Sequence, residues 1–365
     1  MTKHLDSLKI QNFRMLEDFE VEKLGQVNLI VGKNNSGKST VLEALRIYAG
    51  NADRHLLEEI AKSHDELYFL KDEDIQPFTT GVIRPFFSFF SKKSSAPIYK
   101  FSISELTNNQ YLSFQHIHDD TCFRTLASIG LANNIFHGGL KEFYSIKKSQ
   151  YECIEDIRMN KPPIIVGGLS NTPCGFISVT APEMKKLAYL WDTALIAQQE
   201  DTVHDILKLV HDGFKSLIFI ENPHNPNGGR VPYMSVVGEE RRIPLKSQGY
   251  GLQRLLQIAL NIYQAKDGFL LIDEFENGLH YSVQEKVWGL IFEMAKRLNI
   301  QVFATTHSWD CIEAFSEVAS KREDVEGLLF RMGRSAKTSD KGRIIATIFD
   351  EAKLERFTKA DMEVR

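Results

Sequence analysis

The chain has 365 residues, of which 43% are apolar, and it carries a formal net charge of -4. This length and apolar content are enough for one large hydrophobic core or two smaller ones. The acidic balance gives no overall attraction to nucleic acid or anionic membranes, so any DNA binding must depend on a local basic patch. No apolar run approaches the roughly 18 residues that a membrane-spanning helix requires, which favours a cytoplasmic protein. The 4 scattered cysteines lack metal-ligand spacing and predict reduced thiols without a zinc site.

The first informative segment, residues 32–40, fits the pattern G-x-x-x-x-G-K-[ST] and follows an apolar run, Val27 to Val31, that predicts a buried strand. Glycines at both ends let backbone N–H groups surround a β-phosphate, and a helix starting near Gly37 adds the positive end of its dipole. Lys38 can reach the β- and γ-phosphates, and the Ser39 hydroxyl is a ligand for Mg²⁺. The predicted phosphate-binding residues are Gly32, Asn34, Asn35, Ser36, Gly37, Lys38, Ser39 and Thr40.

Residues 51–240 form the least readable part of the chain, with no sustained heptads, internal repeat or low-complexity tract. Their patterns predict a large α+β insertion. The expected helical segments are 51–75 and 183–212, and the expected strands are 99–105, 111–117, two short runs within 162–182, then 216–221, 231–237 and 241–245.

The insertion also combines basic residues with the aromatic run Phe86–Phe90, a mixture that can form a nucleic-acid surface. Solvated lysines over a partly buried aromatic cluster are the favoured interpretation, and docking of a partner protein on Phe86–Phe90 remains open. The basic residues are Arg84, Lys92, Lys93, Lys100, Lys141, Lys147, Lys148, Lys161, Lys185 and Lys186.

After the insertion, an apolar run from Phe269 to Ile272 ends in Asp273 and Glu274, as expected for a central parallel strand that opens into a site. Asp273 would hold Mg²⁺ through water, and Glu274 would be the general base that deprotonates the attacking water. A further strand, 301–307, leads to His307, which we expect beside the two carboxylates in a γ-phosphate- and water-sensing role. Beyond it, the pattern predicts helices at 310–315 and 350–356 and strands at 327–331 and 343–349.

The order of phosphate loop, Ser247-Gln248-Gly249 segment, Asp-Glu strand and Thr-His-Ser turn resembles the ABC-type ATPase head shared by the SMC, RecF and OLD (overcoming lysogenization defect) families. Segments 273–280 and 303–310 are most similar to OLD-type bacterial ATPases. The resemblance implies an α/β fold, an ABC-type P-loop NTPase head with mixed and parallel sheets. Residues 1–50 and 240–365 would form its discontinuous core. Part of the 51–240 insertion would complete the ATPase lobe and part would bind a partner.

In ABC heads two copies meet head to tail, and the signature segment of one completes the phosphate site of the other. The resemblance therefore implies that Ser247 and Gly249 contact the γ-phosphate across a homodimer, from the start of a helix running through Leu252 to Leu260. Tyr250 departs from the glycine pair of the transporter signature and leaves the donor atoms open. The alternative is an ordinary loop in which Ser247 is a helix N-cap.

OLD nucleases carry a TOPRIM nuclease domain after the ATPase, and no segment here has the length for one. The resemblance thus implies an ATP- and Mg²⁺-dependent ATPase that is a nucleotide-gated sensor or scaffold for a separately encoded effector, a TOPRIM-like nuclease, in anti-phage defence. The alternative is a RecF-like DNA-binding repair ATPase. The insertion and altered signature argue against a transporter motor. The lid glutamine stays open among Gln76, Gln110 and Gln115.

Overall fold

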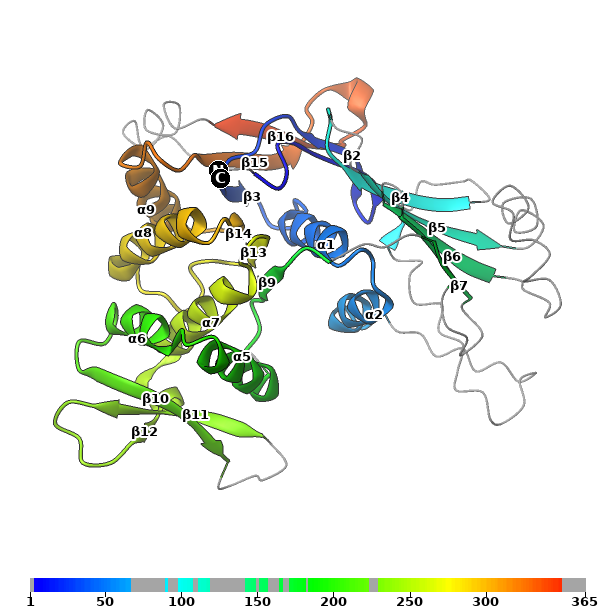
Figure 1. Ribbon diagram of the computed structural model, residues 1–365. Helices are drawn as coiled ribbons and strands as arrows, with labels where there is room; N and C mark the ends of the chain where they lie inside the picture. The colour runs from blue at the N-terminus through cyan, green and yellow to red at the C-terminus, as the bar shows by residue number, and fades with distance from the viewer. Residues whose placement is uncertain are drawn as a thin grey trace.

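A six-stranded sheet lies at the centre of the protein, with strand order β16-β15-β3-β14-β13-β9 (Figure 1). The strands are β3 (Val27–Gly32), β9 (Cys174–Ile177), β13 (Phe269–Ile272), β14 (Gln301–Thr305), β15 (Gly327–Arg334) and β16 (Ile344–Phe349). β9, β13, β14, β3 and β15 run parallel, and β16 pairs antiparallel with β15. The carboxyl ends of the parallel strands therefore meet at one edge of the sheet.

The computed structural model describes most of the chain. The described residues are 3–66, 89–90, 98–107, 111–118, 142–148, 151–156, 164–166, 171–181, 183–222 and 229–349. Among them, no helix is both long and apolar enough to cross a bilayer.

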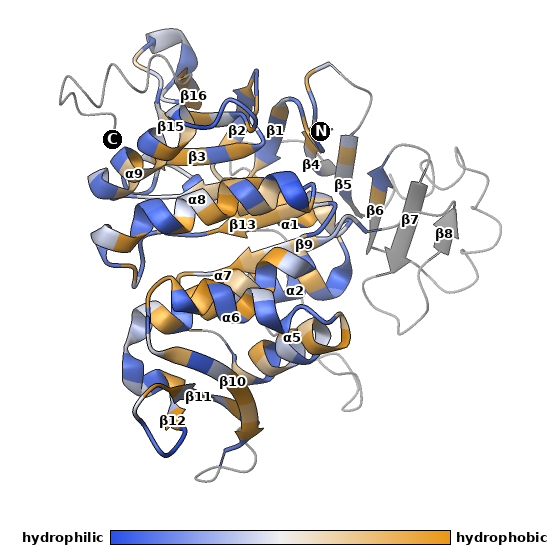
Figure 2. Ribbon diagram, turned by 60° about the vertical axis from the view of Figure 1, so that its left-hand side comes forward, coloured by the Kyte–Doolittle hydropathy of each residue, from blue (hydrophilic) through white to orange (hydrophobic). Residues whose placement is uncertain are grey.

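The central sheet is covered on both faces, which explains why β3, β13 and β14 are buried along their whole length (Figure 2). Leu29, Leu270 and Val302 pack in one core with helices on that face, because successive side chains of a strand point to opposite faces. Leu271 and Phe303 join the other core, together with the helix that follows β3. The helices of the first core include α7 (Tyr250–Gln264), α8 (Tyr281–Arg297) and α9 (Trp309–Ser320), and the helix of the second is α1 (Lys38–Ala49).

A second, seven-stranded sheet pairs its neighbours antiparallel in the order β2-β1-β4-β5-β6-β7-β8. Its strands are β1 (Leu8–Phe13), β2 (Leu16–Val21), β4 (Ile98–Ser104), β5 (Tyr111–His118), β6 (Glu142–Lys148), β7 (Tyr151–Asp156) and β8 (Ile164–Val166). The insertion thus extends the hairpin that opens the chain. Phe89 and Phe90 are buried in the core beneath this sheet, so the described part of the aromatic run packs against its own protein. Phe86 and Phe87 lie outside the described residues.

One expected surface lysine is instead buried. Lys148, at the end of β6, is 8% exposed, and its Nζ donates hydrogen bonds of 2.7 Å to the Tyr48 carbonyl and to Asn51 Oδ1. Burial lowers the pKa of this lysine to about 8. Because its ammonium bonds a carbonyl in the last turn of α1, Lys148 belongs to the packing of the insertion against α1 and not to a basic surface.

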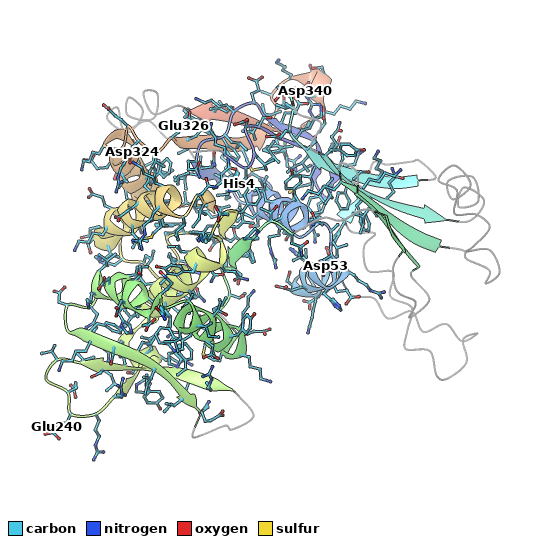
Figure 3. All side chains as sticks on the ribbon, viewed as in Figure 1. His4, Asp53, Glu240, Asp324, Glu326 and Asp340 are labelled. Atoms are coloured by element: carbon cyan, nitrogen blue, oxygen red, sulfur yellow. The ribbon has the colours of Figure 1, made fainter. Side chains whose placement is uncertain are left out.

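The remaining part of the insertion forms a lobe beneath α7 (Figure 1). The lobe consists of α5 (Met184–Ile196), α6 (Glu200–Lys208), β10 (Phe214–Glu221), β11 (Arg230–Val236) and β12 (Ile243–Pro244). Leu187, Trp191 and Ile206 are buried in the same core as α7, so this helix packs between the lobe and the central sheet. Glu240 marks the far end of the lobe, on the turn between β11 and β12 (Figure 3).

Each expected strand has a counterpart among the described elements, with shifted ends, and the helical segment expected over 183–212 is divided into α5 and α6. The helix expected over 51–75 is α2 (Arg54–Ser63), which begins where the Asp53 side chain accepts hydrogen bonds from the His55 and Leu56 backbone N–H groups (Figure 3). Residues 67–75, the helix expected at 350–356, and the candidate lid residues Gln76 and Gln110 fall outside the described part of the chain.

Candidate active site

The phosphate loop connects β3 to α1 through backbone that glycine alone adopts readily. Gly32 has φ +148° and Gly37 has φ +92°. A Cβ on Gly32 would lie 2.4 Å from the Met332 carbonyl oxygen, so a side chain there would force the loop open. The Ser36 hydroxyl inside the loop is buried and has no hydrogen-bond partner among the described residues. A close-fitting backbone with a spare buried donor suits the oxygens of a phosphate group.

Lys38 lies at the start of α1 and is 6% exposed. Its Nζ donates to the Gly32 and Lys33 carbonyl oxygens, at 2.8 and 3.1 Å, and lies 3.5 Å from His307 Nδ1. Burial lowers the pKa of Lys38, while the carboxylates of Asp273, Glu274 and Glu276 act in the opposite direction. The ammonium is therefore held between the phosphate loop and the carboxylate edge.

The two predicted Mg²⁺ ligands lie together. Ser39 Oγ donates to Asp273 Oδ1 at 3.0 Å, and Thr305 Oγ1 donates to the same oxygen at 2.7 Å. Mg²⁺ prefers hard oxygen donors and usually takes few protein ligands alongside substrate phosphates and water. A hydroxyl and a carboxylate beside the phosphate loop fit that preference.

Glu274 and His307 also lie side by side, since β13 and β14 are neighbours. His307 Nε2 is 3.9 Å from Glu274 Oε1, a separation longer than a hydrogen bond, and about a third of each side chain is exposed. Glu274 has φ +48°, which is uncommon for a residue other than glycine. Its backbone N–H donates to Thr305 Oγ1 at 2.8 Å. A strained backbone at this position orients the carboxylate toward the edge shared with His307.

Glu276 is a member of the site that the sequence did not single out. Its Oε2 accepts a hydrogen bond from the Thr306 hydroxyl at 2.7 Å, and its Oε1 accepts one from the His307 backbone N–H at 2.8 Å. Both carboxylate oxygens thus hold the turn that carries His307. Its position, two residues beyond the Asp-Glu pair, could have suggested that Glu276 lies near the site. The sequence does not reveal that its partners are Thr306 and the His307 backbone.

The signature segment occupies the short 3₁₀ helix η4 (Leu245–Gln248) and the start of α7. Ser247 Oγ donates to the Pro244 carbonyl at 2.7 Å, and Gly249, with φ +94°, is the residue before α7. The alternative that Ser247 is the N-cap of this helix is therefore wrong. Ser247 and Gly249 are exposed and, among the described residues, neither is hydrogen-bonded to the phosphate loop. The structure thus brings the other predicted site residues together and leaves this pair on a separate, open surface.

A phosphate loop, an Asp-Glu strand and a histidine turn at one edge of a parallel sheet form the site of a P-loop ATPase. The fold is that of an ABC-type ATPase head, which solved SMC heads share. An SMC head bound to the C-terminal winged-helix domain of ScpA gives a TM-score of 0.50 at 14% identity, covering 96% of this chain and 99% of that one. An SMC head with an extended coiled coil from Pyrococcus furiosus, bound to the C-terminal domain of ScpA, gives 0.50 at 11% identity, covering 99% and 100%.

The family described as AAA ATPase domain matches residues 4–167 and 176–312, and the chain belongs to this family. An ATP/GTP phosphatase of Helicobacter pylori is 22% identical over 348 residues, which cover 87% of this chain and 89% of that protein. An uncharacterised protein of Methanocaldococcus jannaschii is 40% identical over 89 residues, covering 24% and 77%. The protein is an ATPase.

Proposed function

We propose that this ATPase hydrolyses ATP with Glu274 as the general base, and that hydrolysis gates the binding of a separate effector protein. The observation that carries the chemistry is the convergence of Lys38, Asp273, Glu274 and His307 at one sheet edge. Lys38 binds the β- and γ-phosphates, Glu274 accepts the proton of the attacking water, and His307 responds to the γ-phosphate. Ser39 and Asp273 would hold Mg²⁺, which neutralises phosphate charge when bound.

The same proposal includes a head-to-tail homodimer. Ser247 and Gly249 lie exposed at the positive end of α7, where backbone N–H groups favour an anion. Tyr250, the next residue along the chain, is also exposed, at 37%. An exposed aromatic ring next to a helix N-terminus suits contact with a second copy whose phosphate loop presents the nucleotide. The resemblance to ABC heads supports this arrangement.

The effector is a protein partner in this proposal, and the system is anti-phage defence of the OLD type. One observation supports a partner: the similar SMC heads are described as bound to ScpA domains. The defence role rests on the resemblance of segments 273–280 and 303–310 to OLD-type ATPases. The core would comprise residues 1–50 and 240–365, with part of 51–240 completing the lobe and part contacting the effector, a TOPRIM-like nuclease. A RecF-like DNA-binding ATPase is the alternative.

The test is co-purification with the product of the adjacent gene, using the full chain. Glu274→Gln with ATP and Mg²⁺ should hold the ATP state, and Lys38→Ala should remain in the nucleotide-free state. We expect a doubled mass and strong capture of the effector in the first sample and neither in the second. Equal capture in both states contradicts gating. Salt-dependent binding of duplex DNA without a protein partner would favour the RecF-like alternative.

A further inference from the structure

Arg254 is a charged side chain on α7 that is completely buried, with 0% of its surface exposed. One terminal nitrogen, Nη1, donates to the Ser178 carbonyl at 2.7 Å, and the other, Nη2, donates to the Asp273 carbonyl at 2.6 Å and the Glu274 carbonyl at 2.9 Å. Ser178 directly follows β9, and Asp273 and Glu274 directly follow β13. A single guanidinium thus joins α7 to the carboxyl ends of two neighbouring strands.

Burial of this charge is costly unless its donors are satisfied, and burial accordingly lowers the pKa of Arg254. The planar guanidinium can serve several carbonyl oxygens at once, which the single nitrogen of a lysine cannot do with the same geometry. The acceptors here are backbone oxygens at the site itself. Two of these carbonyl groups belong to Asp273 and Glu274, so this buried charge is bonded directly to the backbone of the catalytic carboxylates, while its Nε has no hydrogen-bond partner among the described residues.

The backbone of Glu274 is held from both of its ends. Its N–H donates to Thr305 Oγ1 at 2.8 Å, and its carbonyl accepts from Arg254 at 2.9 Å. These contacts bracket the residue with φ +48°, a conformation that persists only when its surroundings impose it. Loss of the Arg254 contact would free the carbonyl side and allow the Glu274 carboxylate to turn away.

Arg254 also lies about one helical turn after the signature segment. Leu252, Leu255 and Leu256 are buried in the core on the same helix, so the signature segment and Arg254 belong to one packed element. The Tyr250 ring adds a second link, because a Cβ on Gly278 would lie only 2.1 Å from its Cδ1 atom. The helix that begins at the signature segment is therefore bonded directly to the backbone of Glu274.

We infer that Arg254 is a positioning residue, which couples engagement of the signature segment to the placement of the general base Glu274. This inference rests on the proposed roles of Glu274 and of the signature segment. When a second copy engages Ser247 and Gly249, α7 and Arg254 shift together and set the Glu274 carboxylate for catalysis. Without that engagement, the base is held in a less productive position, so hydrolysis follows dimer formation.

The test compares Arg254→Met and Arg254→Lys with Arg46→Met in the full chain. Arg46 is a matched control, because it is also buried on a helix, where it stacks on Phe176 at 4.0 Å and pairs with Glu59. We expect kcat of Arg254→Met to fall roughly tenfold or more while KM for ATP and the affinity for ADP stay within about threefold. Arg254→Lys should recover part of kcat, and Arg46→Met should keep a kcat near that of the unchanged protein.

A second readout separates positioning from stability. Arg254→Met should still dimerise with ATP, since its signature surface is intact, yet dimerisation should no longer raise the turnover per chain. An unchanged kcat in Arg254→Met, or in Arg254→Lys should the Met variant not fold, overturns the inference. So does a loss of ADP affinity parallel to the loss of kcat. If Glu274→Gln itself retains full activity, the proposed catalytic role of Glu274 fails instead.

Discussion

Ser39 and Asp273 are 234 positions apart in the sequence, yet their side chains share a hydrogen bond of 3.0 Å. Ser39 lies in α1, which follows β3, and Asp273 directly follows β13. These two strands are not neighbours in the sheet, because β14 lies between them. Thr305 at the end of β14 fills that position and donates to the same Asp273 oxygen. The strand order therefore places Thr305 beside the Asp273 carboxylate that Ser39 also reaches.

Lys38→Ala should abolish ATP hydrolysis and weaken nucleotide binding. The substitution removes the charge facing the β- and γ-phosphates while the glycine backbone of the loop remains. Steady-state phosphate release and titration with ADP would measure the two effects. Turnover near that of the unchanged protein would contradict the assignment of the loop.

Glu274→Gln should separate binding from chemistry. The amide keeps the size of the side chain but cannot accept the proton of water, so hydrolysis should fall by roughly 10²-fold or more while ATP still binds. Single-turnover hydrolysis and equilibrium binding of ATP would show the split. If Asp273→Asn lowered the rate and Glu274→Gln did not, the base would have to be another group.

Glu276→Ala should lower kcat by roughly tenfold, with a smaller change in KM for ATP. The substitution removes both acceptors that hold the Thr306 hydroxyl and the His307 backbone N–H, so the histidine loses its fixed position. Glu276→Gln retains an acceptor for one of them and should lie between Ala and the unchanged protein. Glu293→Ala, at an exposed position of α8, is the control. Equal rates for Glu276→Ala and Glu293→Ala would exclude the role of Glu276.

The contiguous parts of this site are predictable from the sequence because one short segment contains both the residue types and the strand that places them. Val27 to Val31 and Phe269 to Ile272 read as buried strands since both faces of the sheet are covered. The order of the strands is not encoded locally. For example, β9 from the insertion pairs with β13, although nothing in its short sequence indicates which strand it pairs with.

Side-chain contacts to backbone atoms also cannot be predicted from the sequence. Arg254 binds three carbonyl oxygens, and such acceptors exist at every residue, so no pattern in its partners marks it. In the sequence, Arg254 is indistinguishable from the other polar positions of an amphipathic helix. Ser247 shows that residue type alone can also mislead. Serine is a common N-cap residue, but the residue before α7 is Gly249. Tertiary placement decides which of these polar groups reaches the site.

His64→Asn should remove a pH-dependent part of the stability. Its hydrogen bond with Glu43 of α1 raises the pKa of His64 above 6.5, burial and Arg14 oppose this, and Glu66 supports it. Since the folded pKa exceeds the unfolded value, this stabilisation is complete below about pH 6.5 and is lost as pH rises through the folded pKa. The Tm difference from the unchanged protein should therefore be larger at about pH 6 than at about pH 8. His55→Asn, at an exposed position of α2, is the control substitution.

Mixing two inactive variants tests whether the catalytic site is completed across the dimer. Lys38→Ala keeps an intact signature segment, and Ser247→Arg keeps an intact phosphate loop. In a heterodimer of the two, one site combines the intact Lys38 of one chain with the intact Ser247 of the other, and the second site carries both defects. For independent sites and random pairing of equal amounts, activity should recover to about one quarter of that of the unchanged protein. ATPase rates across a series of mixing ratios, with heterodimers verified by differently tagged chains, would measure this recovery. If heterodimers form and no ratio restores activity, each site must be completed within a single chain, and the exposed position of Ser247 would then need another explanation.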